Sequence, residues 1–309
     1  MDSPNGMDLK ASVVLLTKNP GSSFRETLEA IYRQNLKPME VLVIDSGSTD
    51  GTISLVQKYP AQLIQIKPEA FGHGRTRNLG GNLAKGEFLV FLTQDAVPVR
   101  EDWLFSLVHP LGETEALAGV YGRQIPRHSD PFETFSRYYT YPPVSHCHRG
   151  KDLLHFSVFH LLFSNVNAAL RREVWKKFPF DETLIMSEDQ EWARRVLQRG
   201  FEILYEPRAM VHHSHREGPL RLFKRGFDSG VSFQQMSAAD GMFHHFPETW
   251  AYLKEEIHFL IQTGNSFWIP LLFPRELLRA GGFMVGRYGE KIPKPLKRWC
   301  SFHTQYWRK

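Results

Sequence analysis

The most constraining feature of this chain is an apolar run, Phe88-Leu-Val-Phe-Leu92, that ends abruptly at Thr93-Gln94-Asp95. A run that is apolar at every position suits a strand buried on both faces, as a parallel strand covered by helices is. In such sheets, ligands bind outside the carboxyl ends of the strands. The run therefore predicts a buried parallel strand that brings Asp95 to a ligand-binding edge.

Two further strands of the same kind are expected at residues 11–16 and 41–44. Between them, a helical pattern begins at a capping box, Ser23-x-x-Glu26, and repeats apolar residues at Phe24, Leu28 and Ile31. Alternation of strand, helix and strand is the βαβ unit of a doubly wound sheet. The first half of the chain is therefore predicted to be an α/β domain.

Bulk composition limits the kind of protein. The 309 residues suffice for a large core, and two cysteines, Cys147 and Cys300, make no disulfide framework, so a reducing cytosol is the simplest setting. The first residues lack the pattern of a secretory signal, and no run approaches the ~18 apolar residues that span a bilayer. The net charge is +5, and the excess of Lys and Arg after Arg287 suggests an anionic surface or an acidic ligand.

Asp45 ends the second expected strand, where Gly47 and Gly51 let the backbone turn around a bound group. A carboxylate in this position can accept a hydrogen bond from an N–H on the edge of a nucleobase. A purely structural role in a turn or helix cap is equally open.

Glycines and two arginines, Arg75 and Arg77, stand at the start of another expected helix, in the segment Phe71–Asn78. Backbone N–H groups and guanidinium groups suit a diphosphate, although such loops are common. The segment lacks the ending of a nucleoside-triphosphate loop, and the loop after residue 16 lacks G-x-G-x-x-G. These absences argue against kinase-like and dehydrogenase functions.

The segment Ser187-Glu-Asp-Gln190 has the form of a capping box that opens a helix over residues 191–199. Asp189 could then be a general base, or both acids could simply favour the helix dipole. After an expected strand at residues 202–205, alternate histidines, His213 and His215, project to one side of an extended segment, as metal ligands would.

Two other histidine pairs, His146 with His148 and His244 with His245, lack the second half of a zinc site, so no metal is assigned to them. Residues 123–160 are aromatic and weakly periodic, which predicts a loop over the site or irregular packing. In the tail, five residues fall at helical spacing among basic ones, which suits a helix lying on an anionic membrane or packed on the protein: Leu296, Trp299, Cys300, His303 and Trp307.

Six segments, in order along the chain, resemble the motifs of the family 2 glycosyltransferases, inverting enzymes with the GT-A nucleotide-sugar fold. They are Val13–Asn19, Val43–Gly51, Gly74–Asn78, Thr93–Asp95, Glu188–Asp189 and Val211–His213. More narrowly, five segments look like those of bacterial rhamnosyltransferases of polysaccharide assembly: Phe71–Asn78, Leu92–Pro98, His213–His215, Arg225–Gly230 and Leu296–Trp307.

The resemblance implies roles by position: Asp45 binds the nucleobase, Asp95 and His213 hold a metal on the diphosphate, and Asp189 is the base. The other residues expected to bind substrate are Thr17, Asn19, Arg75, Arg77, Asn78, Gln94, Asn167 and Glu188. The usual D-x-D motif is Thr93-Gln94-Asp95 in this chain, so its first acid is missing, as is typical of the rhamnosyltransferase subgroup.

The resemblance thus implies a GT-A catalytic domain over residues 1–235 and a C-terminal helical extension over residues 236–309. The expected reaction moves a deoxyhexose, with dTDP-rhamnose as donor and Mg²⁺ or Mn²⁺ as cofactor, to a hydroxyl of a glycan or polyprenyl-linked glycan. The expected place is the cytoplasm, at the inner face of the plasma membrane, in cell-surface polysaccharide synthesis.

A UDP-hexose or UDP-N-acetylhexosamine donor and a non-catalytic nucleotide-sugar-binding scaffold are the alternatives, and an oligomer is left open. Nucleic-acid binding is not expected, because no known reader motif accompanies the basic tail.

Overall fold

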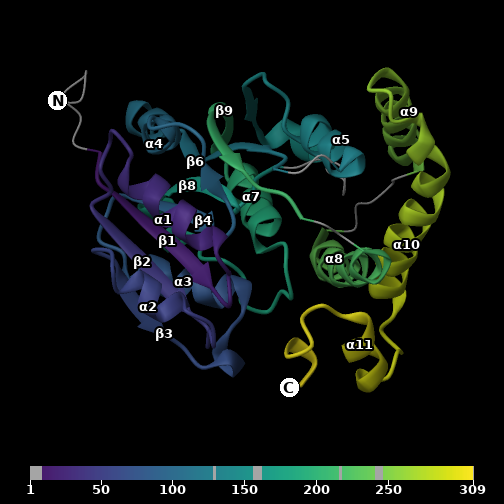
Figure 1. The fold of residues 1–309 in the computed structure, drawn as a ribbon, viewed down its shortest axis with the longest axis horizontal. Coiled ribbons are helices and arrows are strands. Elements are labelled where there is room, and N and C mark those ends of the chain that lie inside the picture. The colour runs from purple at the N-terminus through teal and green to yellow at the C-terminus, as the bar shows by residue number, and fades with distance from the viewer. Residues whose placement is uncertain (1–8, 128–129, 156–161, 216–217, 241–245, 309) are drawn as a thin grey trace.

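A nine-stranded sheet forms the centre of the computed structural model, which describes residues 9–127, 130–155, 162–215, 218–240 and 246–308 (Figure 1). The strand order is β3-β2-β1-β4-β8-β6-β9-β5, and β7 pairs with β9. The strands are β1 Ala11–Thr17, β2 Glu40–Asp45, β3 Gln62–Gln65, β4 Phe88–Thr93, β5 Val97–Pro98, β6 Leu117–Ile125, β7 His146–His148, β8 Asn167–Arg171 and β9 Glu202–His212.

Helices cover the sheet and extend beyond it. Those of the first two thirds are α1 Ser23–Tyr32, α2 Thr52–Val56, α3 His73–Leu83, α4 Trp103–Glu113, α5 Pro131–Thr140, α6 Arg172–Lys177 and α7 Glu188–Gln198. The C-terminal helices are α8 Pro219–Asp240, α9 Phe246–Gln262, α10 Ile269–Tyr288 and α11 Lys294–Cys300. Short 3₁₀ helices occupy Pro68–Ala70, Gly150–His155, Ser266–Trp268 and Tyr306–Arg308.

The expected buried parallel strands are confirmed: β3, β2, β1 and β4 pair in parallel, and alternate side chains enter two separate cores. Val13 and Val90 pack on the side of α1 and α4, whereas Val14 and Phe91 pack on the side of α6 and α7. A strand with apolar residues on both faces fits only between two helical layers. The α/β class is therefore confirmed.

Beyond β4 the sheet is mixed. The strand β8 runs antiparallel to both β4 and β6, and β9 runs parallel to β6. The start of β8 therefore lies at the same edge as the carboxyl ends of β4, β6 and β9. This edge collects most of the polar residues singled out in the sequence.

Four local predictions are wrong. Ser23 and Ser187 cap no helix: α1 and α7 show no side-chain cap hydrogen bond, and Ser187 has φ 62°. The segment 123–160 is not one irregular loop, because it contains the helix α5. Asp130 caps this helix by accepting a hydrogen bond from the Glu133 N–H, and Pro131 is its first residue. The tail helix does not reach Trp307, because α11 ends at Cys300.

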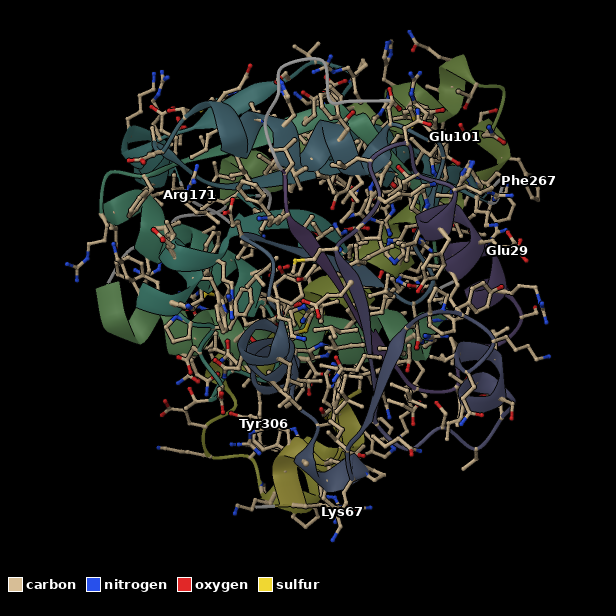
Figure 2. The ribbon with its side chains drawn as sticks, turned by 90° about the vertical axis from the view of Figure 1, so that its left-hand side faces the viewer. Glu29, Lys67, Glu101, Arg171, Phe267 and Tyr306 are labelled. Atoms are coloured by element: carbon tan, nitrogen blue, oxygen red, sulfur yellow. The ribbon has the colours of Figure 1, made fainter. Side chains whose placement is uncertain are left out.

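The C-terminal helices form a layer beside the sheet domain, with α8 packed along α10 (Figure 1). The helix α8 continues through residue 235, where the boundary between catalytic domain and extension was predicted. Phe267, which is 84% exposed, lies at the periphery of the molecule (Figure 2). Among the described helices, none is both long enough and apolar enough to cross a bilayer.

Candidate active site

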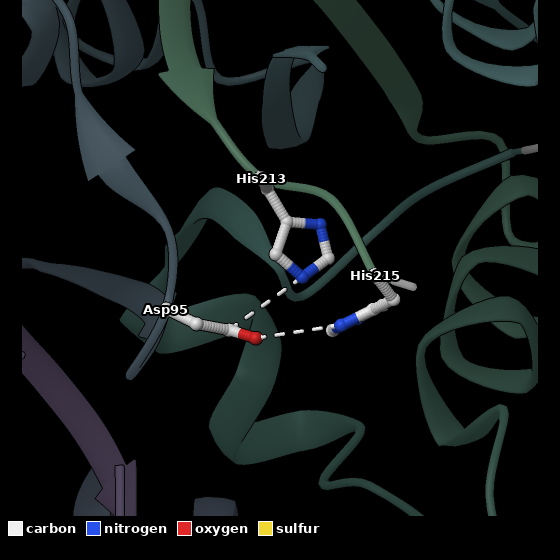
Figure 3. A group of neighbouring side chains, drawn as sticks. All are labelled: Asp95, His213 and His215. Atoms are coloured by element: carbon white, nitrogen blue, oxygen red, sulfur yellow. Dashed lines mark ion pairs between the residues drawn. The ribbon is translucent and has the colours of Figure 1, made fainter. Parts of the chain in front are cut away.

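One acid and two histidines meet at the carboxyl ends of β4 and β9 (Figure 3). Asp95 lies in the turn after β4, and one of its oxygens is 3.5 Å from Nε2 of His213, which directly follows β9. The other oxygen is 3.6 Å from Nδ1 of His215. The prediction for Asp95 and His213 missed His215, although the alternate spacing of the two histidines indicated it.

These residues fit a divalent metal ion. Burial lowers the pKa of His213 well below its usual value and also lowers that of His215, so both imidazoles are neutral, as metal ligation requires. Nδ1 of His213 lies 2.9 Å from Oε1 of Gln124, which fixes the ring and leaves Nε2 towards Asp95. Two imidazoles and one carboxylate on one side of an ion would leave its other positions for a substrate.

A second group forms at the start of α7. Asp189 is partly exposed, and its carboxylate accepts hydrogen bonds from the backbone N–H groups of Asn165 at 3.1 Å and Gln190 at 2.9 Å. The loss of surrounding water raises the pKa of Asp189 to about 6, and the neighbouring Glu188 carboxylate adds to the rise. Such a group accepts a proton near neutral pH, which is what a general base must do.

Glu188 has the opposite surroundings. Its buried carboxylate forms an ion pair with Arg77 and accepts a hydrogen bond from the side chain of Asn165 at 3.3 Å. Burial alone would raise the pKa of Glu188, but the Arg77 guanidinium outweighs it and the pKa is lowered. Glu188 is therefore an ionised carboxylate that holds Arg77 in place.

Hydrogen bonds connect the metal-type cluster to the Asp189 group. Gln124, which contacts His213, also donates from Nε2 to Oγ of Ser164 at 3.1 Å. Ser164 directly precedes Asn165, and Thr93 N–H donates to the Val166 carbonyl at 3.1 Å. Asp95, His213 and Asp189 therefore belong to one connected site at the sheet edge.

The loops after β1, β2 and β4 are tied to one another by four predicted substrate-binding residues. Thr17 donates to the Asp45 carboxylate, Asn19 accepts from the backbone after Ser48, and Gln94 accepts from the Lys18 N–H at 2.8 Å. Asp45 is fully buried and also accepts the N–H groups of Gly47 and Ser48. These contacts fit a structural role of Asp45 in the turn and hold the ends of the strands in register. Binding of the nucleobase by Asp45 stays a prediction.

Three other predicted residues have protein partners. Arg75 pairs at the surface with Glu182 at 3.4 Å. Asn78 is buried, and its amide contacts the backbone of Phe180 with both its ends. Asn167 is fully buried between Trp103 and the Ala209 carbonyl, so this structure gives it an internal role, and its neighbour Asn165 is the one that contacts the acids.

A further histidine cluster lies away from these residues on β7. His146 and His148 have potential ligand atoms within 4.8 Å of one another and of Asp152. The sequence interpretation assigned no metal to this pair and did not consider Asp152. The other pair, His244 and His245, lies outside the described residues.

Residues 12–178 match the family model described as Glycosyl transferase family 2. The chain is 31% identical over 307 residues to the O-antigen chain rhamnosyltransferase WbaN of Salmonella anatum, which covers 96% of this chain and 95% of that protein. It is 30% identical to the O-antigen chain rhamnosyltransferase RfbN of Salmonella typhimurium, with coverage of 97% and 96%.

Among solved structures, the mannosyltransferase PcManGT of Pyrobaculum calidifontis, in complex with GDP-Man and Mn²⁺, is similar in fold. Its TM-score is 0.53 at 19% identity, over 96% of this chain and 84% of that one. The expected GT-A architecture is thereby confirmed.

Proposed function

Because the chain belongs to glycosyl transferase family 2 and is therefore a glycosyltransferase, we propose that it moves L-rhamnose from dTDP-rhamnose to a glycan hydroxyl with inversion. The acceptor is a glycan or a polyprenyl-linked glycan of cell-surface polysaccharide synthesis. Two relatives named as O-antigen chain rhamnosyltransferases support this, since each is similar over nearly its whole length and nearly the whole of this chain.

The observation that carries the proposal is the connection of a metal-type cluster to a carboxylate whose pKa is about 6. Asp95, His213 and His215 lie on one side, Asp189 on the other, and Gln124 and Ser164 join them. A transferase that uses a nucleotide-sugar needs both groups close together. The metal-type cluster would stabilise the departing diphosphate, and the carboxylate would accept the proton of the acceptor hydroxyl.

Asp189 acts as the general base. Its carboxylate is oriented by the N–H groups of Asn165 and Gln190, and it takes the proton from the attacking acceptor hydroxyl. The hydroxyl oxygen forms a bond to the anomeric carbon while the bond to the nucleoside diphosphate breaks on the opposite face. A single displacement of this kind inverts the configuration of the sugar.

A divalent cation held by Asp95, His213 and His215 would neutralise charge on the diphosphate. Mg²⁺ prefers oxygen ligands, so two imidazoles favour Mn²⁺ over Mg²⁺ at this cluster. Arg75 is the better candidate for a direct diphosphate contact, because its ion pair with Glu182 is exposed. Arg77 pairs through Nη1 with the buried Glu188.

We place the reaction at the inner face of the plasma membrane, with peripheral contact through the C-terminal helices. Exposed apolar residues recur at helical spacing along α10 and form what we call the α10 stripe: Phe273, Leu277, Met284 and Tyr288. Lys291, Lys294, Lys297 and Arg298 follow directly. An apolar face next to a basic segment suits an anionic lipid surface, and a lipid-carried acceptor would be presented there.

Transfer assays with a panel of donors test the proposal. With Mn²⁺, a rhamnosylated acceptor glycan should form from dTDP-rhamnose, and NMR should show the anomeric configuration inverted relative to the donor. Transfer only from UDP-glucose or UDP-N-acetylglucosamine would support the glycosyltransferase function but show that dTDP-rhamnose is not the donor. Binding of nucleotide-sugars without transfer to any acceptor would favour a scaffold.

A further inference from the structure

The chain after α11 folds back and is fastened to α8 by a buried carboxylate. Asp228 is fully buried, and it accepts hydrogen bonds from Oγ of Ser301 at 2.6 Å, from Phe302 N–H at 2.8 Å and from His303 N–H at 3.3 Å. Hydrogen bonds that involve a charged group are about twice as strong as neutral ones. Asp228 therefore ends α11 and determines the course of residues 301–303.

A second set of contacts fixes the rest of this segment. The hydroxyl of Tyr306 donates to the Thr183 carbonyl at 3.1 Å and accepts from the side chain of Gln235 at the same distance. The ring of Trp307 lies 6.1 Å from that of Phe227 on α8. The segment is thus tied both to α8 and to the loop that leads into α7.

This course brings His303 to the group around Asp189. The ring centroids of His303 and His73, the first residue of α3, are 4.8 Å apart in an edge-to-face arrangement. Burial lowers the pKa of both imidazoles, to about 3 for His73, and in both cases the Glu188 carboxylate acts against this effect. His73 lies one turn before Arg77 on α3, and Arg77 pairs with Glu188, so the two neutral imidazoles lie on the side of α3 that faces Glu188, the neighbour of the proposed base.

Polar atoms of two residues that contact Glu188 lack partners. Nε of Arg77 and Oδ1 of Asn165 are buried without a hydrogen bond, and both residues contact Glu188. Within the described part of the chain, no hydrogen bond reaches a ring nitrogen of His73 or His303. Buried polar groups in native proteins nearly always have a partner, so unpaired donors and acceptors at one place indicate a polar ligand.

We propose that His73 and His303, together with Arg77 and Asn165, bind hydroxyl groups of the transferred sugar, so that the C-terminal segment completes the donor site. The proposal rests on the proposed function. The helix α3 carries Arg75, the diphosphate candidate, and Glu188 adjoins the base Asp189. The sugar of a nucleotide-sugar is bonded to the diphosphate and must present its anomeric carbon near the base, so it lies between these two elements.

His303 is then a specificity-determining residue, and Asp228 is a positioning residue that acts through it. A neutral imidazole has one donor and one acceptor nitrogen, which matches a sugar hydroxyl. A sugar without a hydroxyl at that position leaves the imidazole without a hydrogen-bond partner, which weakens binding.

Isothermal titration calorimetry with dTDP and dTDP-rhamnose, both with Mn²⁺, separates sugar contacts from nucleotide contacts. His303→Ala should raise the Kd of dTDP-rhamnose by about 5- to 30-fold, which corresponds to the loss of ~1–2 kcal/mol of binding free energy. The Kd of dTDP should stay within about 2-fold of the wild-type value. His303→Gln keeps a donor and an acceptor, so it should recover most of the affinity. Asp228→Asn should show the same selective loss, and His258→Ala, an exposed histidine on α9, should show none.

The results distinguish this inference from the function on which it rests. If the wild-type protein binds neither dTDP-rhamnose nor UDP-glucose, both fail. One of these donors could bind, with His303→Ala weakening its binding no more than the binding of its nucleoside diphosphate. That result would refute the contact between His303 and the sugar and leave the proposed glycosyltransferase function unaffected. If His303→Ala is too unstable to measure, the comparison of His303→Gln with Asp228→Asn decides: equal loss for nucleotide and nucleotide-sugar would mean a structural role only.

Discussion

Glu188 and Asp189 are adjacent carboxylates that ionise differently because their surroundings differ. Arg77 keeps Glu188 ionised, whereas loss of water and the charge of Glu188 raise the pKa of Asp189. Pairs of acids whose environments push their pKa values apart often divide the roles of charge and proton acceptor. We therefore assign proton transfer to Asp189 and orientation to Glu188.

Asp189→Asn removes the proposed base and keeps the shape of the side chain. The amide oxygen can still accept the N–H of Asn165, so the fold and the binding of dTDP should be preserved. Loss of a general base typically costs 10²- to 10⁴-fold, so kcat should fall by about that factor. Steady-state kinetics with a matched calorimetric Kd for dTDP checks this, and a kcat within about 3-fold of wild type would exclude Asp189 as the base.

The pH dependence of kcat/KM should report Asp189. The base works only when deprotonated, and the pKa of Asp189 is about 6, so kcat/KM should fall tenfold per pH unit below about 6. Burial lowers the pKa of His213 and of His215, and bound Mn²⁺ would disfavour their protonation further, so saturating Mn²⁺ limits their contribution to the profile. A flat profile from pH 5 to 7 would contradict the assignment.

The sequence could identify these acids but not their charge states. The pattern Ser187-Glu-Asp-Gln190 has the form of a capping box, yet Ser187 adopts φ 62° and caps nothing. The partners that decide the outcome, Arg77 and Asn165, lie far away in the chain. Such contacts leave no local signal in a single sequence.

At the scale of elements, glycines determine how closely α8 and α10 approach. Gly226 and Gly230 lie on α8, and Gly282 and Gly286 lie on α10, at the same four-residue spacing. A Cβ on any of them would collide with the backbone of the opposite helix. Small residues at this spacing let helix backbones pack in direct contact.

Gly282→Ala should destabilise the protein, because its Cβ would collide with the Phe223 carbonyl oxygen. Overpacking of this kind costs about 1–3 kcal/mol. Gly281→Ala is a matched control on the same helix, since a Cβ there meets nothing within 4 Å, and it should be stabilising by about 0.5–1 kcal/mol. Urea unfolding of both variants measures the change in the free energy of unfolding. Equal changes for the two variants would refute the close contact between α8 and α10 at Gly282.

The same scale shows which elements a single sequence predicts well. The strands β1, β2 and β4 were predicted within one residue at most ends, because an apolar run bounded by turn residues is a local signal. The end of α11 was missed, because it depends on Asp228, which acts from α8. The sequence predicted two members of the metal-type cluster, since Asp95 and His213 follow strands closely, whereas the internal roles of Asn78 and Asn167 depend on distant partners.

For the whole molecule, the α10 stripe and the basic segment after it predict binding to anionic lipid. Leu277 is 74% exposed in the described part of the chain, so insertion of this side chain should contribute about 1–2 kcal/mol. Vesicles with phosphatidylglycerol should bind the protein, and pure phosphatidylcholine vesicles should not, in sedimentation assays. Leu277→Glu should weaken binding by about 5- to 30-fold.

Met39→Glu is the matched control for this prediction, because Met39 is an exposed apolar residue before β2, far from α10 in the chain. It should leave vesicle binding unchanged. Vesicle binding by Leu277→Glu equal to wild type would exclude the stripe as a lipid contact. A concentration-dependent dimer that this substitution abolishes would show that a second copy covers the stripe instead.

Thermal unfolding with dTDP and with dTDP-rhamnose, each with and without Mn²⁺, tests whether this edge of the sheet is a metal-dependent nucleotide-sugar site. A ligand at about 100 times its Kd adds ~2.7 kcal/mol to the free energy of unfolding. The wild-type protein should be stabilised by nucleotide only when Mn²⁺ is present, and Asp95→Asn should abolish this effect. Absence of any nucleotide effect in the wild-type protein, or a full effect in Asp95→Asn, would contradict the site described for Asp95, His213 and His215.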